Sequence, residues 1–429
     1  MREMKDSGIE WIGKIPSTWT IQRIKDAYTL QTGFTPDTKQ SDYYDDEDGF
    51  DWITIADLGI EKSIPKSTKA KISKKYVSLF HPIPAPQGSL LYSFKLSVGQ
   101  VAFTNRQIFT NEAIASFLPA NDECLNFLYY AAFLIEYNAN TNIYGAHILN
   151  QQLIKDAHIV NPPIDEQYKI ADFLDSKCSE IDTISADIQK EIETLEQYKR
   201  SVITEAVTKG LNPDVEMKDS GVAWCPQIPS NWQYSNPKGL FGLRTDRAFR
   251  DDRQLTASQE YGIVYQDEYM EKTGNKVVTV TKDFSILKHV EPDDFVISMR
   301  SFQGGLEYSD KRGCISSAYV MLIPNKKFVY APFYRWFFKS SKYINALQST
   351  SNLVRDGQAM RYANFVKVPL FIIPIEEQKA ITSYLDEKIE KVNSILAAKK
   401  NQLEILLNYK KSLIYEYVTG KKEVPMYES

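Results

Sequence analysis

Cysteine and histidine are scarce in this chain of 429 residues, which contains four of each. The cysteines lie far apart without a CxxC pair, and the histidines show neither HxxH nor HxxxH spacing. These patterns indicate neither a disulfide framework nor a zinc site, so we expect free thiols and no bound metal. The cysteines are Cys124, Cys178, Cys225 and Cys314.

Long apolar runs are missing as well. No stretch of about eighteen uncharged apolar residues is present that could span a bilayer. The opening segment MREMKDSGIEW has no apolar signal core. We therefore expect a soluble protein that stays in the cytoplasm.

Recognisable catalytic motifs are also absent, since there is no GxxxxGKS loop, no GxSxG elbow and no PD-(D/E)xK pattern. The segment Asn161-Pro162-Pro163-Ile164 is similar to the NPP-aromatic motif of amino-group DNA methyltransferases, which act on a flipped base. Ile164 replaces the aromatic residue, and no glycine-rich methyl-donor motif precedes the segment. We interpret it as a helix start and predict a chain without catalytic residues.

The net charge of -4 argues against a protein that coats nucleic acid indiscriminately. Between Gln233 and Phe365, however, nineteen Lys and Arg face fourteen Asp and Glu. Four arginines in this region recur at every third residue, and they are Arg244, Arg247, Arg250 and Arg253. Because charge runs are usually solvated faces, this excess permits nucleic-acid binding without establishing it.

The strongest positive feature is an internal repeat. Residues Met4–Trp19 (MKDSGIEWIGKIPSTW) and Met217–Trp232 (MKDSGVAWCPQIPSNW) share ten of sixteen positions at an offset of 213. Pro163–Gln167 (PIDEQ) likewise recurs as Pro374–Gln378 (PIEEQ). In each half, about 140 unrelated residues separate the two repeated segments. The sequence therefore encodes one frame twice, around two different inserts.

Each half ends in a long amphipathic pattern, with apolar residues three and four positions apart after Pro163 and Pro374. First-turn prolines and the glycines Gly210 and Gly420 mark the predicted ends of two helices. Neither helix can bury its apolar face alone, so we expect the two helices to form an antiparallel coiled coil. A heptad assignment predicts its core residues as Ile181, Ile184, Ile188, Leu195, Tyr198, Val392, Leu396, Leu403 and Tyr409.

The inserts consist of short β-rich runs, such as Val277–Val280, that alternate with turns and short apolar helices. We predict an α+β fold in which two α+β domains are joined by two long antiparallel coiled-coil helices with pseudo-two-fold symmetry. The chain termini should then be adjacent. The predicted parts are residues 1–162, the first domain; 163–211, the central helix; 212–373, the second domain; and 374–429, the C-terminal helix.

Two matching loops in the inserts carry side chains suited to nucleic acid. An alignment after an apolar strand pairs Lys95 with Arg300 and Gly99 with Gly304. Lys and Arg bind phosphates, Arg also binds guanine edges, and Gln binds adenine edges. The alternative interpretation is an ordinary hairpin turn in each insert.

Two further loops, 140–150 and 352–362, are rich in basic and amide residues and precede the long helices. Solvated loop ends would have the same composition. Together the four loops give a set of predicted DNA contacts: Ser93, Lys95, Ser97, Gln100, His147, Ser298, Arg300, Ser301, Gln303, Arg355, Gln358 and Arg361.

The repeated PxxEQ helices, the IP-x-x-W segment before each insert and the two dissimilar inserts resemble the specificity subunit of bacterial type I restriction-modification systems. The resemblance covers essentially the whole chain. It implies a non-catalytic DNA-recognition subunit whose inserts are target-recognition domains, each reading one half of a bipartite, asymmetric DNA sequence.

The same resemblance implies that the repeated helices set the spacing between the half-sites and dock two modification (methyltransferase) subunits. Those subunits bind S-adenosylmethionine, and the restriction (translocase and nuclease) subunits use ATP and Mg²⁺, so no cofactor is expected on this chain. Two other interpretations remain open, a solitary DNA methyltransferase and a coiled-coil scaffold that binds proteins.

Overall fold

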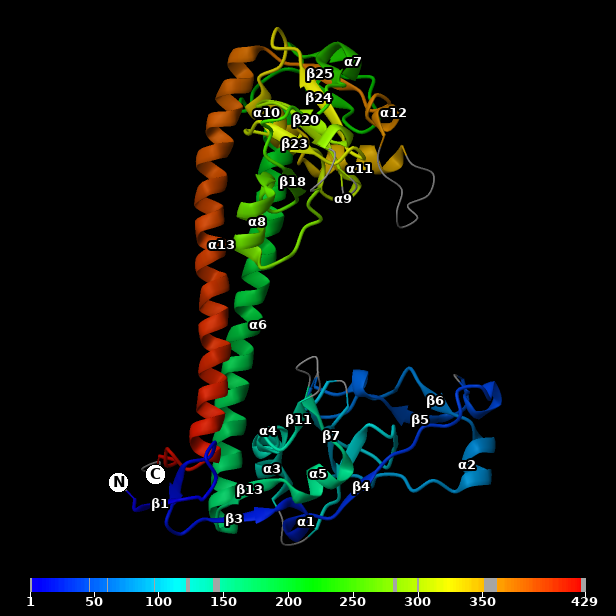
Figure 1. Ribbon diagram of the computed structural model, residues 1–429, viewed down its shortest axis with the longest axis vertical. Helices are drawn as coiled ribbons and strands as arrows, with labels where there is room; N and C mark the ends of the chain where they lie inside the picture. Colours follow the sequence, from blue (N-terminus) through cyan, green and yellow to red (C-terminus); the bar gives the residue numbers. More distant parts are fainter. Residues whose placement is uncertain are drawn as a thin grey trace. The chain divides into compact units, whose positions relative to one another are not determined.

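The computed structural model describes residues 2–45, 47–59, 61–95, 97–120, 124–141, 147–280, 284–298, 301–350 and 361–425. It divides into unit 1, which contains Met1–Asp187 and Gln402–Ser429, and unit 2, which contains Ile188–Asn401. Two long helices, α6 (Ile164–Lys209) and α13 (Ile375–Val418), each contribute one part to either unit (Figure 1).

Apart from the long helices, unit 1 is built from short elements. In chain order these are β1 (Met4–Asp6), β2 (Lys14–Pro16), β3 (Thr20–Arg23), α1 (Ile24–Ala27), β4 (Leu30–Thr32), η1 (Ser41–Tyr43), β5 (Phe50–Ile53), η2 (Ile55–Asp57), β6 (Lys71–Ile72), α2 (Lys74–Phe80), β7 (Leu90–Ser93), β8 (Val101–Phe103), β9 (Phe109–Thr110), β10 (Ile114–Phe117), α3 (Leu125–Ala131), α4 (Phe133–Glu136), β11 (Asn140–Thr141), β12 (His147–Ile148), α5 (Gln151–Asp156) and β13 (His158–Asn161).

Unit 2 is built in the same way. Its short elements are β14 (Met217–Asp219), β15 (Gln227–Pro229), β16 (Gln233–Ser235), α7 (Pro237–Leu240), β17 (Phe241–Arg244), β18 (Leu255–Ser258), β19 (Gly262–Tyr265), α8 (Gln266–Thr273), η3 (Phe284–Ile286), β20 (Lys288–Val290), β21 (Phe295–Ile297), α9 (Ser301–Gly304), β22 (Glu307–Tyr308), β23 (Gly313–Ile315), β24 (Val320–Pro324), α10 (Ala331–Phe337), α11 (Ser341–Ser349), α12 (Tyr362–Phe365) and β25 (Leu370–Ile372).

The two units repeat one topology although their inserts are unrelated in sequence. A four-stranded antiparallel sheet has the order β4-β10-β7-β8 in unit 1 and β17-β24-β21-β22 in unit 2. A second pairing joins β3 to β13 and, equivalently, β16 to β25. Each insert is therefore an α+β domain, as predicted.

The sequence of strand β7 is a continuous apolar run rather than an alternating one, because both faces of the strand are buried. Leu90 and Tyr92 belong to the main core of unit 1, which also contains Leu174 of α6. Leu91, on the opposite face, packs in a second cluster with Ile53. All of these side chains are buried because the sheet is covered on both faces.

The long helices begin and end where the sequence predicts. Helix α6 follows Pro163 and stops before Gly210, whose φ of 75° is left-handed and suits glycine. Helix α13 follows Pro374 and ends two residues before Gly420, which has a φ of 70°. Acidic residues in both first turns complement the helix dipole.

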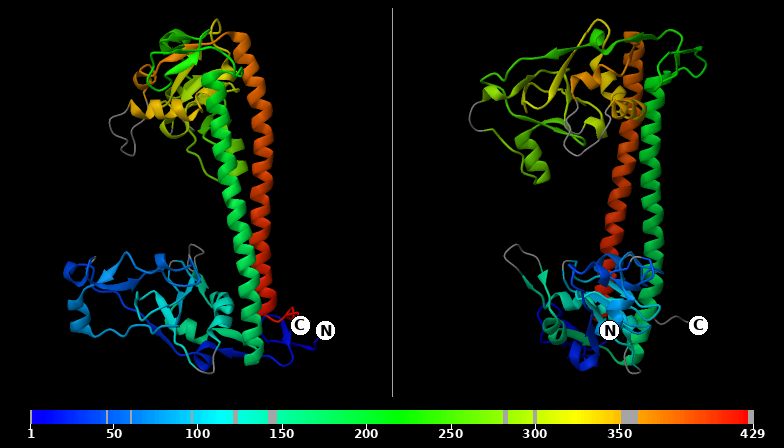
Figure 2. Two further views of the ribbon diagram at one scale, coloured as in Figure 1. Left: turned by 180° about the vertical axis from the view of Figure 1, so that it is seen from behind. Right: turned by 90° about the vertical axis from the view of Figure 1, so that its right-hand side faces the viewer.

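The contacts between the two long helices show that the helices run antiparallel, because the later residue of α13 pairs with the earlier residue of α6. In unit 1, Lys410 Nζ lies 2.6 Å from Asp182 Oδ1. In unit 2, Lys399 Nζ lies 2.5 Å from Glu191 Oε2. Figure 2 shows the two helices side by side within each unit. The predicted antiparallel coiled coil is thus confirmed in each unit.

The residues that are buried between the two long helices differ in part from those that the heptad assignment predicts. Ile181, Ile192 and Ile203 are 5% exposed each, and they recur every eleven residues on α6. On α13 the buried Ile381 and Val392 are also eleven apart. An eleven-residue spacing, about 3.67 residues per turn, nearly matches the period of a straight helix, whereas a strict heptad drifts away from it.

Three predicted core residues are exposed rather than buried between the helices. Ile184, Tyr198 and Tyr409 are 49%, 44% and 53% exposed, so the heptad assignment is wrong for them. Leu195 and Leu403 are half-buried. The remaining predicted core residues are buried, and they are Ile181, Ile188, Val392 and Leu396.

Another correction concerns Val277–Val280, which is not a strand. Val278 is 89% exposed. The backbone of Val280 bonds instead to the side-chain amide of Gln254, at 2.9 Å through its N–H and at 2.8 Å through its carbonyl oxygen. A side chain thus takes the place of a partner strand.

The repeated segments bind one another at the helix ends. In unit 1, Trp19 Nε1 donates to Glu166 Oε2 at 2.9 Å, and Arg2 Nη1 lies 2.8 Å from the same oxygen. Arg2 Nη2 also donates to the carbonyl oxygen of Gly420 at 3.3 Å. The N-terminal segment therefore lies against the end of α13, which confirms that the termini are adjacent (Figure 1).

Unit 2 repeats this arrangement with covalently continuous chain. Asn231 Nδ2 donates to Glu377 Oε2 at 3.0 Å. A Cβ on Gly210 would lie 3.8 Å from Trp232 Cζ2, just as a Cβ on Gly420 would meet Trp19. The Glu of each PxxEQ motif thus holds the segment that carries the repeated tryptophan.

Candidate nucleic-acid interface

The two predicted recognition loops occupy equivalent places. Residues Phe94–Gln100 connect β7 to β8, and residues Ser298–Leu306 connect β21 to β22. These strand pairs lie at the same edge of the two matching sheets. The two loops that the sequence alignment pairs therefore lie at equivalent places in two unrelated inserts.

In the first loop, a buried serine holds the others in place. Ser93 Oγ accepts a hydrogen bond of 3.0 Å from the backbone N–H of Gln100 and donates to the carbonyl oxygen of Ser97. Lys95 is exposed, and its Nζ lies 3.3 Å from Glu112 Oε1. Because an exposed ion pair of this kind is weak, Lys95 can exchange Glu112 for a phosphate. Ser93 itself has a structural role.

In the second loop, Ser301 has the corresponding role. Its Oγ accepts a 2.8 Å hydrogen bond from the backbone N–H of Ser298, and both serines are buried. Gln303 is exposed on the short helix α9. Lys339 supports the helix by donating to the carbonyl oxygen of Gly304 at 2.9 Å. The short helix replaces the hairpin turn found in unit 1.

Several other predicted contacts cannot be placed. Arg300, Arg355 and Gln358 lie outside the described residues. His147 is the first residue of the short strand β12. Arg361 is exposed at the N-terminal end of α12, and its backbone N–H donates to Asn364 Oδ1 at 3.2 Å. The structure thus leaves the second pair of loops as a prediction.

A buried ion pair lies directly beneath the second loop. Glu307 is 3% exposed, and its Oε1 lies 2.6 Å from Lys339 Nζ. Burial raises the pKa of Glu307, and Lys339 counteracts part of that effect. Since Lys339 also binds Gly304, this pair fixes the position of α9.

The evenly spaced arginines mainly hold unit 2 together. Arg244 Nε lies 2.5 Å from Asp294 Oδ2, and Arg253 Nη2 lies 2.9 Å from Asp267 Oδ2. Their charges are therefore neutralised within the domain. Arg250 is exposed, and in the described part of the chain no carboxylate pairs with it.

Two residues of the repeated PxxEQ motif have a positioning role beyond the predicted helix start. Gln378 is fully buried and donates to the carbonyl oxygens of Phe328 and Ile373, at 2.8 Å each. Gln167 donates in the same way to the carbonyl oxygen of Pro162 and to Asn161 Oδ1, at 2.9 Å each. The recurrence of a glutamine at a helix start was the signal that could have revealed them.

The contact to Gln167 also explains the methyltransferase-like segment. Asn161 directs its side-chain oxygen to Gln167 Nε2, and α6 begins at Ile164. The interpretation as a helix start is therefore confirmed. All four cysteines are free and buried, as expected, and burial raises the pKa of Cys178 to about 11.

Within the described residues, no cluster of three or more His, Cys, Asp or Glu side chains could hold a metal ion. Over the same residues, no helix combines the length and the apolar character that crossing a membrane requires.

Comparison with known proteins identifies the family. Residues 16–194 and 229–405 match the family described as type I restriction modification DNA specificity domain. The putative type I restriction enzyme MjaX specificity subunit of Methanocaldococcus jannaschii is 23% identical, with 96% of each chain covered. The MjaIX specificity subunit of the same organism is 30% identical over 43% of each chain.

The fold has a solved counterpart from a study of complex assembly and conformational transition of the type I R-M system. That chain superposes with a TM-score of 0.67 at 13% identity, covering 95% of this chain and 99% of the other. The likeness supports the fold alone. Two copies of the family domain, on two equivalent α+β inserts, make this chain a member of the type I restriction-modification DNA specificity subunits, the non-catalytic subunits that recognise DNA sequence.

Proposed function

We propose that this chain recognises a bipartite, asymmetric DNA sequence, each α+β insert reading one half-site. The observation that carries the proposal is the equivalence of the β7–β8 and β21–β22 loops in two unrelated inserts. The sequence alignment assigns each loop one basic residue, Lys95 and Arg300. Lys95 and Arg300 are the proposed central contacts, because Lys and Arg reach both phosphates and base edges. Unlike inserts on a repeated frame then produce a non-palindromic target.

Two half-sites read together need no strongly basic surface. The second contact becomes intramolecular once the first has formed, so modest affinities combine through a high effective concentration. Binding through two half-sites is therefore compatible with a net charge of -4 and with the internal neutralisation of arginines such as Arg244. The proposed parts of the chain remain the domains 1–162 and 212–373 and the helices 163–211 and 374–429.

The exposed apolar residues of the long helices support the docking of partners. Ile184 and Tyr409 are exposed and leave apolar surface open on the helix pair of unit 1. We assign this surface to the docking of two modification subunits, which carry S-adenosylmethionine. The assembled complex then binds restriction subunits, which use ATP and Mg²⁺. The complex acts in the bacterial cytoplasm, where its DNA lies.

Mapping methylated bases in a host that expresses this chain with its modification subunits tests the proposal. We expect methylation confined to one two-part motif whose halves differ and are separated by unread bases. A palindromic motif, or methylation by the purified chain alone, would contradict it. If no motif appears although the complex assembles, the chain is a protein-binding scaffold.

A further inference from the structure

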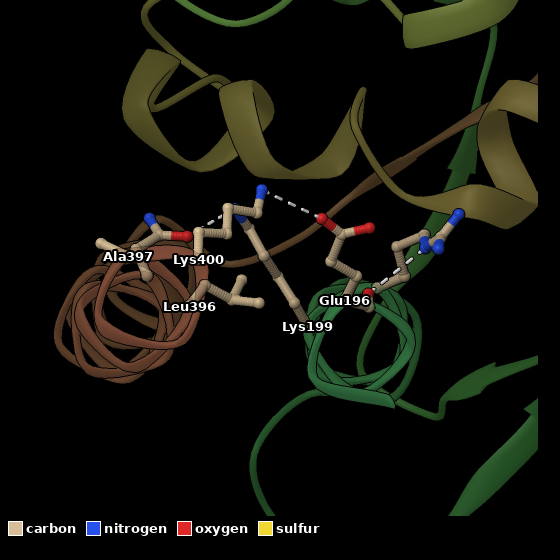
Figure 3. A pocket seen from close by; sticks show the side chains of 7 residues that line it. Glu196, Lys199, Leu396, Ala397 and Lys400 are labelled. Atoms are coloured by element: carbon tan, nitrogen blue, oxygen red, sulfur yellow. Dashed lines mark hydrogen bonds and ion pairs between the residues drawn. The ribbon is translucent and has the colours of Figure 1, made fainter. Parts of the chain in front are cut away.

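A hollow opens between the long helices within unit 2, which we call the seam hollow (Figure 3). Its volume is about 450 Å³. Leu396 and Ala397 provide its apolar lining, and the other lining residues are Glu196, Lys199, Arg200, Asn393 and Lys400. Buried apolar residues such as Ile192 and Val392 form the seam nearby, whereas polar side chains make up most of the lining of the hollow.

The seam hollow carries more positive than negative charge. Its three cationic side chains, Lys199, Arg200 and Lys400, face one carboxylate, Glu196. That carboxylate already binds Lys400, with 3.4 Å between Oε1 and Nζ. Lys199 donates instead to the neutral Asn393 Oδ1, at 2.6 Å.

Arg200 is engaged only through its Nε, which donates to the backbone oxygen of Glu196 at 3.3 Å. In the part of unit 2 that the structure describes, neither Lys199 nor Arg200 forms an ion pair. The terminal nitrogens of Arg200 form the planar fork that binds phosphate through two parallel hydrogen bonds. The hollow therefore has two positive charges that the protein does not balance.

The surroundings connect the seam hollow to the candidate recognition loop of unit 2. One helical turn beyond Arg200, Thr204 Oγ1 accepts a 3.2 Å hydrogen bond from the backbone N–H of Ser341, the first residue of α11. Helix α11 packs in turn against α9, and a Cβ on Gly305, the residue after α9, would lie 3.5 Å from Ile344 Cγ1. Figure 3 shows Glu196, Lys199 and Lys400 projecting toward the side of the helix pair where short helices of unit 2 lie.

We propose that the seam hollow binds a phosphate group through Arg200, Lys199 and Lys400. The phosphate has two possible sources, a phosphodiester of bound DNA outside the half-sites or a free phosphate ion. The first source rests on the proposed function, and the second does not. Glu196 limits the site to one anionic group, because a second anion would face its carboxylate.

The test compares Arg200→Gln/Lys400→Gln with the control Lys190→Gln/Lys391→Gln, which removes two exposed charges from the same part of the helix pair. Both are made in the full chain, and each removes the same charge. For the DNA source, binding to a random-sequence duplex is measured against salt. We expect the slope of log K on log salt to fall by about 1 in the first variant, since one phosphate contact contributes about 0.9. The control slope should match the wild type.

For the free ion, thermal unfolding is followed in sodium phosphate and in sodium chloride of equal ionic strength. Phosphate should raise the Tm of the wild type and the control above the chloride value, and Arg200→Gln/Lys400→Gln should lose this difference. Arg200→Lys should retain part of either effect, because it keeps the charge without the fork. If the double variant fails to fold, the exposed single change Arg200→Gln replaces it.

The outcomes separate the two proposals. A wild type that binds the duplex with the same salt slope as the double variant, and gains no Tm from phosphate, overturns the seam site and leaves DNA recognition standing. A wild type that binds no duplex, even with its modification subunits, contradicts the proposed function, and the phosphate arm still decides the site. If the double variant changes the stability of the chain but neither the salt slope nor the phosphate-dependent difference in Tm, these residues serve helix pairing alone.

Discussion

The side-chain carbonyl oxygen of Gln378, on the first turn of α13, accepts a 2.8 Å hydrogen bond from the backbone N–H of Tyr330. With its two donated bonds to Phe328 and Ile373, this side chain joins the helix to the loop before α10 through backbone atoms only. Backbone atoms are present whatever the sequence of the insert. One residue of the frame can thus hold a domain whose own residues vary.

Replacing Gln378 with Leu should destabilise unit 2 by about 3 kcal/mol or more, because one N–H and two carbonyl groups lose their buried partners. Urea unfolding followed by circular dichroism measures the change. Gln189→Leu, an exposed change on α6 in the same unit, is the control and should cost less than about 0.5 kcal/mol. Equal effects of the two changes would show that Gln378 does not anchor the domain.

Replacing Arg300 with Ala should weaken binding to one half-site by about 1 to 3 kcal/mol if this residue reads a base. The loss should then depend on the bases of that half-site and spare the other. If Arg300 touches only phosphate, binding should weaken equally for all sequences. Electrophoretic binding assays of the assembled methyltransferase on targets altered in either half-site distinguish these results, with the exposed Lys238→Ala as control. Unchanged binding removes Arg300 from the interface.

A circular permutant that joins Ser429 to Met1 and opens the chain near Asn212 should fold. The new junction connects segments that already lie together, since Arg2 binds the carbonyl oxygen of Gly420 and Lys421 Nζ donates to the backbone oxygen of Ile12 at 2.6 Å. The opening falls in the exposed turn after α6. We expect wild-type circular dichroism and a Tm within a few degrees of the wild type. A permutant that is unfolded would refute the equivalence of the two junctions.

The stability of unit 2 should respond to alkaline pH through Lys199. Burial between the helices lowers the pKa of Lys199 from its ordinary 10.5. The folded chain therefore binds this proton less tightly than the unfolded chain, and this residue makes stability rise with pH between the folded pKa and 10.5. Lys199→Met should be the more stable form at neutral pH, by up to about 1 kcal/mol because the side chain is half-exposed.

That advantage should shrink as the pH approaches 10.5, the ordinary value for lysine. Urea unfolding of Lys199→Met and wild type near neutral and near that alkaline limit measures the difference. Lys391→Met, on the exposed face of α13, should show no such convergence. A constant difference between Lys199→Met and wild type would mean that the seam does not perturb this lysine.

The frame was largely predictable because local rules determine it. Pro163 and Gly210 mark the limits of α6, and the repeated segments gave both long helices and the adjacent termini. The helix seam was only partly predictable from a heptad template, because some buried residues are eleven positions apart and Ile184 is exposed. Nor could the partner of Gln378 be inferred, since it is the backbone of a distant loop.

The inserts were predictable in class and less so in detail. Alternating apolar runs located most strands, but Val277–Val280 failed because Gln254 satisfies that backbone from far away in the sequence. The recognition loops could be aligned through Gly99 and Gly304. Their conformations could not, since a hairpin turn and the short helix α9 fill the same place.

The contacts that close each helix end involve Trp19 with Glu166 and Asn231 with Glu377, all of them within the repeated segments. A crossover between two related genes within such a segment would exchange a whole insert and leave these contacts complete. The repeated segments are therefore boundaries at which one insert can be replaced by another while the frame that holds it stays intact.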